Sequence, residues 1–108
     1  MHRKTEEFQS NDGLQAAQRA AICHVLEQFP VVQSALLYGS RAMGRHRQGS
    51  DIDLTLKGDI DLQTLNAISN ALDDLLLPLN IDLSTWNEID NEELKQHIER
   101  VGKVFFCR

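Results

Sequence analysis

The sequence contains little cysteine, little proline and no long apolar segment, and each shortage argues against a class of protein. Its 108 residues include two cysteines and two prolines. The cysteines, Cys23 and Cys107, show no metal-ligand spacing and no secretory signal accompanies them, which favours a reduced, cytoplasmic protein but leaves a disulfide between them open. No apolar run approaches the roughly 18 residues of a membrane-spanning helix. We therefore expect neither a disulfide-stapled secreted domain nor a membrane protein.

Positive charge is also scarce. The chain has 11 Lys and Arg against 16 Asp and Glu, a formal net charge of −5, whereas non-specific binding of DNA or RNA needs clustered basic residues. We therefore expect no direct nucleic-acid binding. One basic cluster interrupts the acidic chain, and it consists of Arg41, Arg45, His46 and Arg47. A solvated loop is the better interpretation for His46, and for Arg45 and Arg47 it is as good as a ligand-binding role.

Hydrophobic periodicity predicts a small layered α/β domain. The length leaves room for one hydrophobic core. Apolar residues at helical spacing predict helices over 12–29, 62–76 and 90–101, and strand-like patterns predict strands over 34–39, 50–57 and 79–84. Between the first two strands, "SRAMG" suits a short helical turn, and "KVFF" near the end suits an extended segment. Residues 1–11 are expected to form a flexible tail.

Two aspartates stand inside the second predicted strand, "SDIDLTLK", although strands tend to exclude Asp. Asp51 and Asp53 are two residues apart, so their side chains share one face while the apolar residues take the other. Two carboxylates so placed repel one another unless cations lie beside them. Asp82, in "NIDLS" of the next strand, would supply a third carboxylate. Three aspartates on adjacent strands suit a divalent-metal site for phosphoryl transfer.

A glycine–serine turn comes before the aspartates. Gly39 allows a ligand to approach the backbone closely, and free N–H groups at the start of a helical turn attract anions. The Ser40 hydroxyl adds a donor, and Arg41 adds positive charge for the same phosphate. The stretch is not a Walker A loop, because no Gly-Lys-Ser/Thr follows, and it lacks the GxGxxG pattern. The turn therefore predicts a phosphate site of another kind.

Together, "GSRAMG…SDIDL" resembles the signature of the DNA polymerase beta-type nucleotidyltransferase superfamily, in which Gly-Ser is followed after a loop by Asp-x-Asp. In its length the chain is most similar to the minimal nucleotidyltransferases, the MNT or MntA-like antitoxins. The resemblance extends from the first predicted helix through "VGKVFF". It implies a small nucleotidyltransferase fold over 12–108, a short mixed β-sheet flanked by about four helices in the order αβαβαβα.

The resemblance also implies roles for individual residues. Asp51 and Asp53 would hold two Mg²⁺ ions, with Mn²⁺ as an alternative, and Asp82 would complete the catalytic ion. The phosphates of a nucleoside triphosphate would be bound by Gly39, Ser40, Arg41 and Ser50. Because carboxylates and a triphosphate repel each other, we expect the metal to be obligatory.

Two positions make this transfer of roles less direct. Met43 stands where many relatives carry a basic residue in "GSRARG", and Arg45 or Arg47 would have to replace that contact. The third carboxylate has rivals in Asp73, Asp74 and Asp90, but these lie in helical or capping contexts, and Asp90 is predicted to cap the last helix. We therefore favour Asp82 as the third carboxylate.

His97, on the last predicted helix, is most simply a surface or core polar residue.

The implied partner is a protein. MNT-like proteins are encoded beside an all-helical HEPN-domain ribonuclease toxin, act as its antitoxin and in studied cases transfer AMP to it. By resemblance, this chain would transfer AMP from ATP to a hydroxyl of a HEPN-type partner in a type VII-like system, as a hetero-oligomer or alternatively a homodimer. A second hypothesis is a non-catalytic nucleotide-binding subunit that neutralises the partner by complex formation. A metal-dependent nuclease would leave the Gly-Ser turn unexplained.

Overall fold

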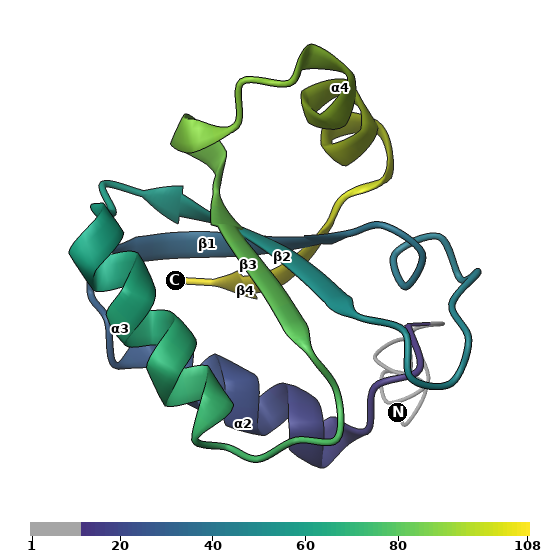
Figure 1. Ribbon diagram of the computed structural model, residues 1–108, viewed down its shortest axis with the longest axis horizontal. Helices are drawn as coiled ribbons and strands as arrows, with labels where there is room; N and C mark the ends of the chain where they lie inside the picture. Colours follow the sequence, from purple (N-terminus) through teal and green to yellow (C-terminus); the bar gives the residue numbers. More distant parts are fainter. Residues whose placement is uncertain (1–11) are drawn as a thin grey trace.

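The structure is a computed structural model that describes residues 12–108; the flexible tail expected over 1–11 lies outside them. In chain order the elements are α2 (Ala16–Glu27), β1 (Val32–Tyr38), β2 (Ile52–Gly58), α3 (Leu62–Asp73), β3 (Ile81–Thr85), the 3₁₀ helix η1 (Trp86–Glu88), α4 (Glu92–Val101) and β4 (Lys103–Cys107). Figure 1 shows their arrangement around one sheet. The α/β class is confirmed, and the predicted helices and strands follow in the expected order except for the short helix between β1 and β2.

The sheet is mixed, with the strand order β3-β2-β1-β4. β1 pairs antiparallel with both β2 and β4, whereas β2 and β3 run parallel. A parallel pair needs a crossover connection, and α3 provides it between β2 and β3. The extended segment expected near the end of the chain is the edge strand β4. This order makes β2, which carries Asp53, one of the two central strands, and Asp51 directly precedes it.

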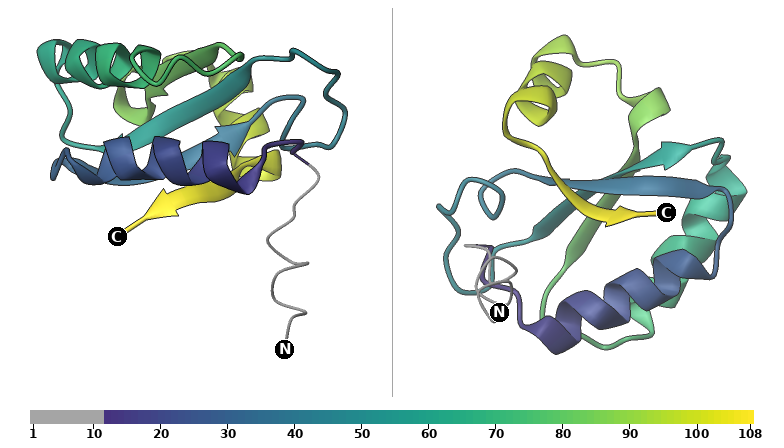
Figure 2. Two further views of the ribbon diagram at one scale, coloured as in Figure 1. Left: turned by 90° about the horizontal axis from the view of Figure 1, so that it is seen from below. Right: turned by 180° about the vertical axis from the view of Figure 1, so that it is seen from behind.

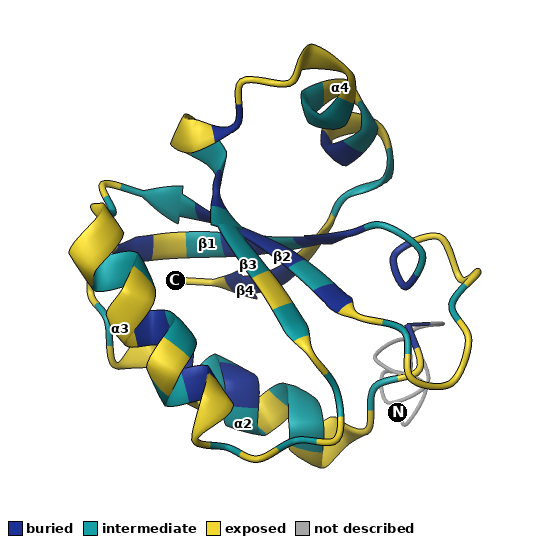
Figure 3. Cartoon of the chain, in the orientation of Figure 1, coloured by how far each residue is buried: buried dark blue, intermediate teal, exposed yellow. Residues whose placement is uncertain are grey.

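α2 and α3 cover one face of the sheet. The apolar half of the β2 alternation faces them, and Ile52, Leu54 and Leu56 are each fully buried (Figure 3). From the helices, Leu26 and Ile68 are also fully buried in this cluster. Removing a side chain of this size from water contributes about 1.5–3 kcal/mol. The core therefore requires that Asp53, between Ile52 and Leu54, face the opposite side.

α4 lies on the opposite side of the sheet from α2 and α3, as the views in Figure 2 also show. A second, smaller apolar cluster forms there from Tyr38, Ile89 and Ile98. Ile98 is only 1% exposed, and Leu36 and Leu94 pack against the cluster from strand and helix. The face that carries Asp53 is therefore partly covered by α4.

Local details differ from the sequence prediction at three places. α4 is capped by Asn91, not Asp90: the Asn91 side chain accepts a hydrogen bond from the Leu94 N–H at 3.1 Å. α2 begins at Ala16 rather than at residue 12. The expected short helix after β1 is present only as turns, including one helix-like bond from the Met43 N–H to the Gly39 carbonyl at 3.2 Å. The first two differences shift helix boundaries, the third replaces a predicted short helix by turns, and none changes the fold class.

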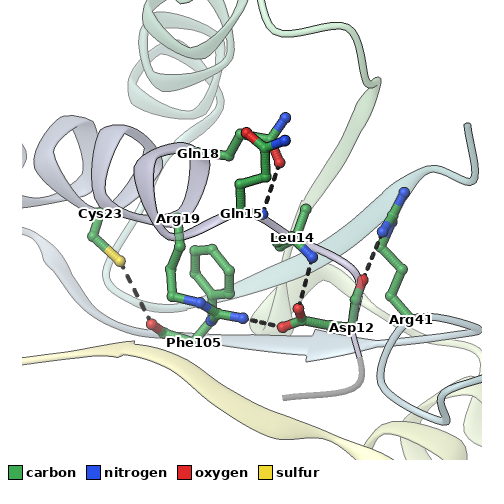
Figure 4. A network of polar contacts seen from close by, with 8 residues as sticks. All are labelled: Asp12, Leu14, Gln15, Gln18, Arg19, Cys23, Arg41 and Phe105. Carbon is green, nitrogen blue, oxygen red and sulfur yellow. Dashed lines mark hydrogen bonds and ion pairs between the residues drawn. The ribbon is translucent and has the colours of Figure 1, made fainter. Parts of the chain in front are cut away.

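Both cysteines are free, which resolves the open question of a disulfide. Cys23 is partly buried on α2, with its sulfur 3.6 Å from the Phe105 carbonyl oxygen of β4 (Figure 4). Cys107 is exposed. Within residues 12–108, none of the helices has both the length and the apolar character needed to cross a bilayer.

We expect Ile98→Ala to lower the free energy of unfolding by about 2–4 kcal/mol, because it opens a cavity between α4 and the sheet. Val104→Ala on β4 is the matched control: this side chain is 67% exposed, and its truncation should cost less than about 0.5 kcal/mol. Urea unfolding followed by circular dichroism measures both values. Equal effects of the two substitutions would contradict the packing of α4 on the sheet.

Candidate functional site

A row of three polar side chains crosses the α4 face of the sheet. Tyr38 of β1 pairs with Asp53 of β2, and Asp53 pairs with Asp82 of β3. Residues in register on neighbouring strands project from the same face, so the two carboxylates point to the same side. Asp53 is half-buried and Asp82 is exposed, and Asp51 lies exposed just before β2. The structure thus places Asp82, rather than a rival carboxylate, beside Asp53.

The carboxylates of Asp51 and Asp82 interact electrostatically with the carboxylate of Asp53. Burial is the first cause that raises the pKa of Asp53, and the charges of Asp82 and Asp51 raise it further, while His97 acts in the opposite direction. Burial also raises the pKa of Tyr38. The Ser84 side chain lowers this pKa, whereas the charges of Asp53 and Asp82 raise it further. The ionised form of Asp53 is therefore unfavourable until a cation or donor compensates it.

The acidic row offers few protein ligands for a metal ion. Within residues 12–108, no group of three or more His, Cys, Asp or Glu side chains is close enough to hold one. Mg²⁺ needs fewer protein ligands, because it commonly binds one or two carboxylates and completes its shell with water and phosphate oxygens. Asp53 and Asp82 offer two carboxylates from neighbouring strands, and Asp51 adds a charge that Asp53 senses. This donor set fits a hard divalent ion that arrives with a phosphate ligand.

The Gly-Ser turn lies directly against the acidic row. Gly39 has a φ of +80°, and a Cβ atom there would be 2.3 Å from the Asp53 Oδ2 atom. Both the backbone conformation and this close approach therefore require glycine. In the turn that follows, none of the described residues accepts a hydrogen bond from the backbone N–H groups of Ser40 and Arg41. The turn thus presents amide donors at the edge of the carboxylate row.

The Arg41 side chain holds the loop between β1 and β2. It is 3% exposed, and its Nη1 donates to the Asp12 carbonyl at 2.6 Å (Figure 4). Its Nε and Nη2 donate to the Ser50 carbonyl at 3.1 and 2.9 Å. The Ser50 hydroxyl accepts from the Arg47 N–H at 2.8 Å. Two side chains predicted to bind phosphate, Arg41 and Ser50, therefore form hydrogen bonds within this loop, which leads directly to Asp51. Their role in phosphate binding stays a prediction.

The remaining candidates lie outside the row. Asp73 and Asp74 are exposed at the end of α3, which packs on the other face, and Asp90 is exposed before α4. Met43 is 39% exposed. The alternative basic residues, Arg45 and Arg47, are exposed as well.

Sequence reasoning missed His97 as a residue of this site. Its Nε2 accepts a hydrogen bond from the Gly39 N–H at 3.3 Å, and its ring meets the Tyr38 ring edge-on with centroids 6.3 Å apart. The available signal was its spacing. His97 is three residues after Leu94 and four before Val101, on the same side of the helix as the predicted buried stripe. That spacing indicates that His97 faces the sheet, but not that it reaches Gly39.

The sequence and the fold both resemble those of known proteins. A family profile described as "Polymerase beta, Nucleotidyltransferase" matches residues 20–108. No curated protein matches the chain significantly.

Several solved structures share the fold. A toxin-antitoxin complex with AMP-PNP is 22% identical, with a TM-score of 0.68, over 83% of this chain and 73% of that chain. A tri-AMPylated Shewanella oneidensis HEPN toxin in complex with MNT antitoxin is 20% identical, with a TM-score of 0.65, over 88% and 74%. The toxin-antitoxin MntA-HepT is 21% identical, with a TM-score of 0.65, over 87% and 74%. At these identities the likeness shows the fold.

In the metal-free protein we expect Asp53→Asn to raise the melting temperature at pH 7. The native pKa of Asp53 lies above its ordinary value, so the native state holds this proton more tightly than the unfolded chain, and ionisation destabilises the fold as pH rises. The gain should vanish below the unfolded pKa of about 3.9, where the carboxyl is protonated in both states.

Thermal unfolding in EDTA at pH 7 and in acid measures this dependence. Asp59→Asn, which removes an exposed carboxylate elsewhere on the chain, is the control and should leave the melting temperature nearly unchanged. A lower melting temperature for Asp53→Asn at pH 7 would contradict the repulsion among the carboxylates.

We expect Arg41→Lys to lower the free energy of unfolding by about 2–3 kcal/mol, because one ammonium group cannot replace donors to two carbonyls and each bond from a charged group is worth about 1.5–3 kcal/mol. Arg45→Lys at an exposed position is the control. Unchanged stability of Arg41→Lys, together with weakened nucleotide binding, would show instead that the guanidinium serves the phosphate. Urea unfolding and nucleotide titration distinguish the two results.

Proposed function

The chain belongs to the polymerase beta nucleotidyltransferase family, and we propose that it transfers AMP from ATP to a hydroxyl group of a HEPN-type protein partner. One observation carries this proposal: the carboxylates of Asp53 and Asp82 stand in register on adjacent strands, directly beside the Gly39 turn. A triphosphate seated on the turn would have its phosphorus atoms next to the acidic row.

In the proposed reaction, the acceptor oxygen attacks the α-phosphorus of ATP, the bond from that phosphorus to the bridging oxygen breaks, and pyrophosphate leaves. Divalent ions, Mg²⁺ or Mn²⁺, would supply the charge that neutralises the triphosphate and the departing group. Asp51 and Asp53 would hold these ions with Asp82. Because Asp82 is the exposed member of the row, it is the carboxylate that an incoming hydroxyl reaches, and we assign it the acceptor's proton.

The phosphates would be bound from the backbone. Gly39 has no side chain to separate the triphosphate from the turn, and the N–H groups of Ser40 and Arg41 would donate to its oxygens. The Arg41 side chain would act by holding the loop, through its bonds to Asp12 and Ser50. The folded unit of 12–108 would thus supply both parts of the site, the phosphate turn and the metal ligands.

The choice of partner rests on similar structures and on the open side of the site. One similar solved complex pairs an MNT antitoxin with a tri-AMPylated HEPN toxin, and another toxin-antitoxin complex contains AMP-PNP, an analogue of ATP. In this chain the Asp82 side chain is exposed, so an acceptor on another protein can reach it. We accordingly propose a type VII-like antitoxin that forms a hetero-oligomer with its partner in the cytoplasm.

We expect the HEPN-type partner, incubated with this protein, ATP and Mg²⁺, to gain mass in steps of one AMP residue. Asp51→Asn with Asp53→Asn should slow this transfer by about 10³-fold, because metal stabilisation worth several kcal/mol is lost. Asp59→Asn is the matched control and should transfer normally. Intact-mass spectrometry follows the reaction.

The same double variant decides between turnover and binding alone. If cells that carry the toxin lose protection when the variant replaces the wild type, turnover is required. Full protection by the variant, with no mass increase by the wild type under any nucleotide, would identify a binding subunit that neutralises its partner by occlusion.

A further inference from the structure

The Gly39 N–H, another amide of the proposed phosphate turn, already has an acceptor. The Gly39 N–H donates to His97 Nε2 at 3.3 Å, and this bond joins residues from β1 and α4 that are 58 positions apart. His97 is held over the turn by its edge-on contact with Tyr38, which is 9% exposed, and by the anchoring of its neighbour Ile98.

One amide proton serves one good acceptor at a time. A triphosphate oxygen that binds the Gly39 N–H must therefore replace His97 Nε2. We propose that His97 competes with the triphosphate for this amide and so lowers the affinity of the site for nucleotide. This inference rests on the proposed function, because it assumes that the turn binds phosphate.

Release of His97 does not require α4 to move. Ile98, on the same helix, is buried in the cluster with Tyr38 and Ile89, whereas His97 itself is only half-buried. A rotation of the imidazole is enough to free the amide. An exchange of one neutral hydrogen bond of this kind corresponds to an affinity change of about two- to tenfold.

A direct contact between His97 and phosphate would give the opposite sign. An imidazole that donated to the triphosphate would strengthen binding, and its removal would weaken it. The arrangement favours competition, because in the structure His97 accepts from the turn rather than offering it a proton. The sign of the change in triphosphate affinity when His97 is replaced therefore distinguishes competition from direct contact. A purely structural role predicts neither tighter binding without the acceptor nor its reversal when an acceptor is restored.

The test uses inorganic triphosphate with Mg²⁺, titrated into the full chain by calorimetry. His97→Phe keeps an aromatic ring against Tyr38 but has no acceptor, and should bind triphosphate about two- to tenfold more tightly than the wild type. His97→Gln keeps an acceptor oxygen and should restore affinity close to that of the wild type. Adenosine, which has no phosphate, should show no difference among the three proteins.

A second measurement on the unaltered protein guards against misfolding of a variant. The ¹⁵N resonance of His97 Nε2 should shift when triphosphate saturates the site, because the nitrogen loses its Gly39 donor. Equal or weaker triphosphate binding by His97→Phe, or an unmoved Nε2 resonance at saturation, overturns the competition while leaving the proposed function intact. If even the wild type binds no triphosphate with Mg²⁺, the proposed function fails and this inference fails with it.

Discussion

The pairing register of β2 with its two neighbours is the constraint on which the site depends. Asp53 lies between Tyr38 and Asp82 only because β1, β2 and β3 pair as they do. Side chains alternate along a strand, so a slip of one residue in β2 would turn Asp53 into the core and Leu54 toward α4. The burial of Leu54 on the α2 and α3 side opposes that slip. Apolar packing on one face of the sheet thus determines the positions of the Asp53 and Asp82 carboxylates on the other face.

The site on that face is electrostatically unfavourable by itself. Burial and the charges of Asp82 and Asp51 raise the pKa of Asp53, and Gly39 brings the backbone so close that even a methyl group would collide with its carboxylate. Such crowding opposes folding in the absence of a compensating cation. The buried Arg41 and the packed core stabilise the surrounding backbone instead. A divalent ion with a phosphate ligand would relieve the repulsion at the point where the family's chemistry needs positive charge.

Local patterns predicted the parts of the site, and long-range pairing decided how they meet. The alternation in "SDIDLTLK" indicated correctly that Asp53 opposes Leu54, and the turn at Gly39 was recognised from its residues. The hydrogen bond from the Arg41 side chain to Asp12 could not be predicted, because Asp12 is 29 positions away and accepts through its backbone carbonyl. His97 was on the expected face of its helix, but its contact with Gly39 depends on how α4 crosses the sheet, which periodicity does not specify.

The bond between His97 and Gly39 also connects α4, which packs on the acidic face, to the turn proposed for phosphate. Thermodynamic linkage then makes the two events reciprocal. A protein that binds α4 and holds His97 on Gly39 must weaken triphosphate binding, and triphosphate must weaken that protein's binding by the same factor. A protein that draws His97 away must have the opposite effect. If His97 competes with triphosphate as proposed, the binding of the acceptor protein and the binding of the nucleotide would depend on each other before any chemistry begins.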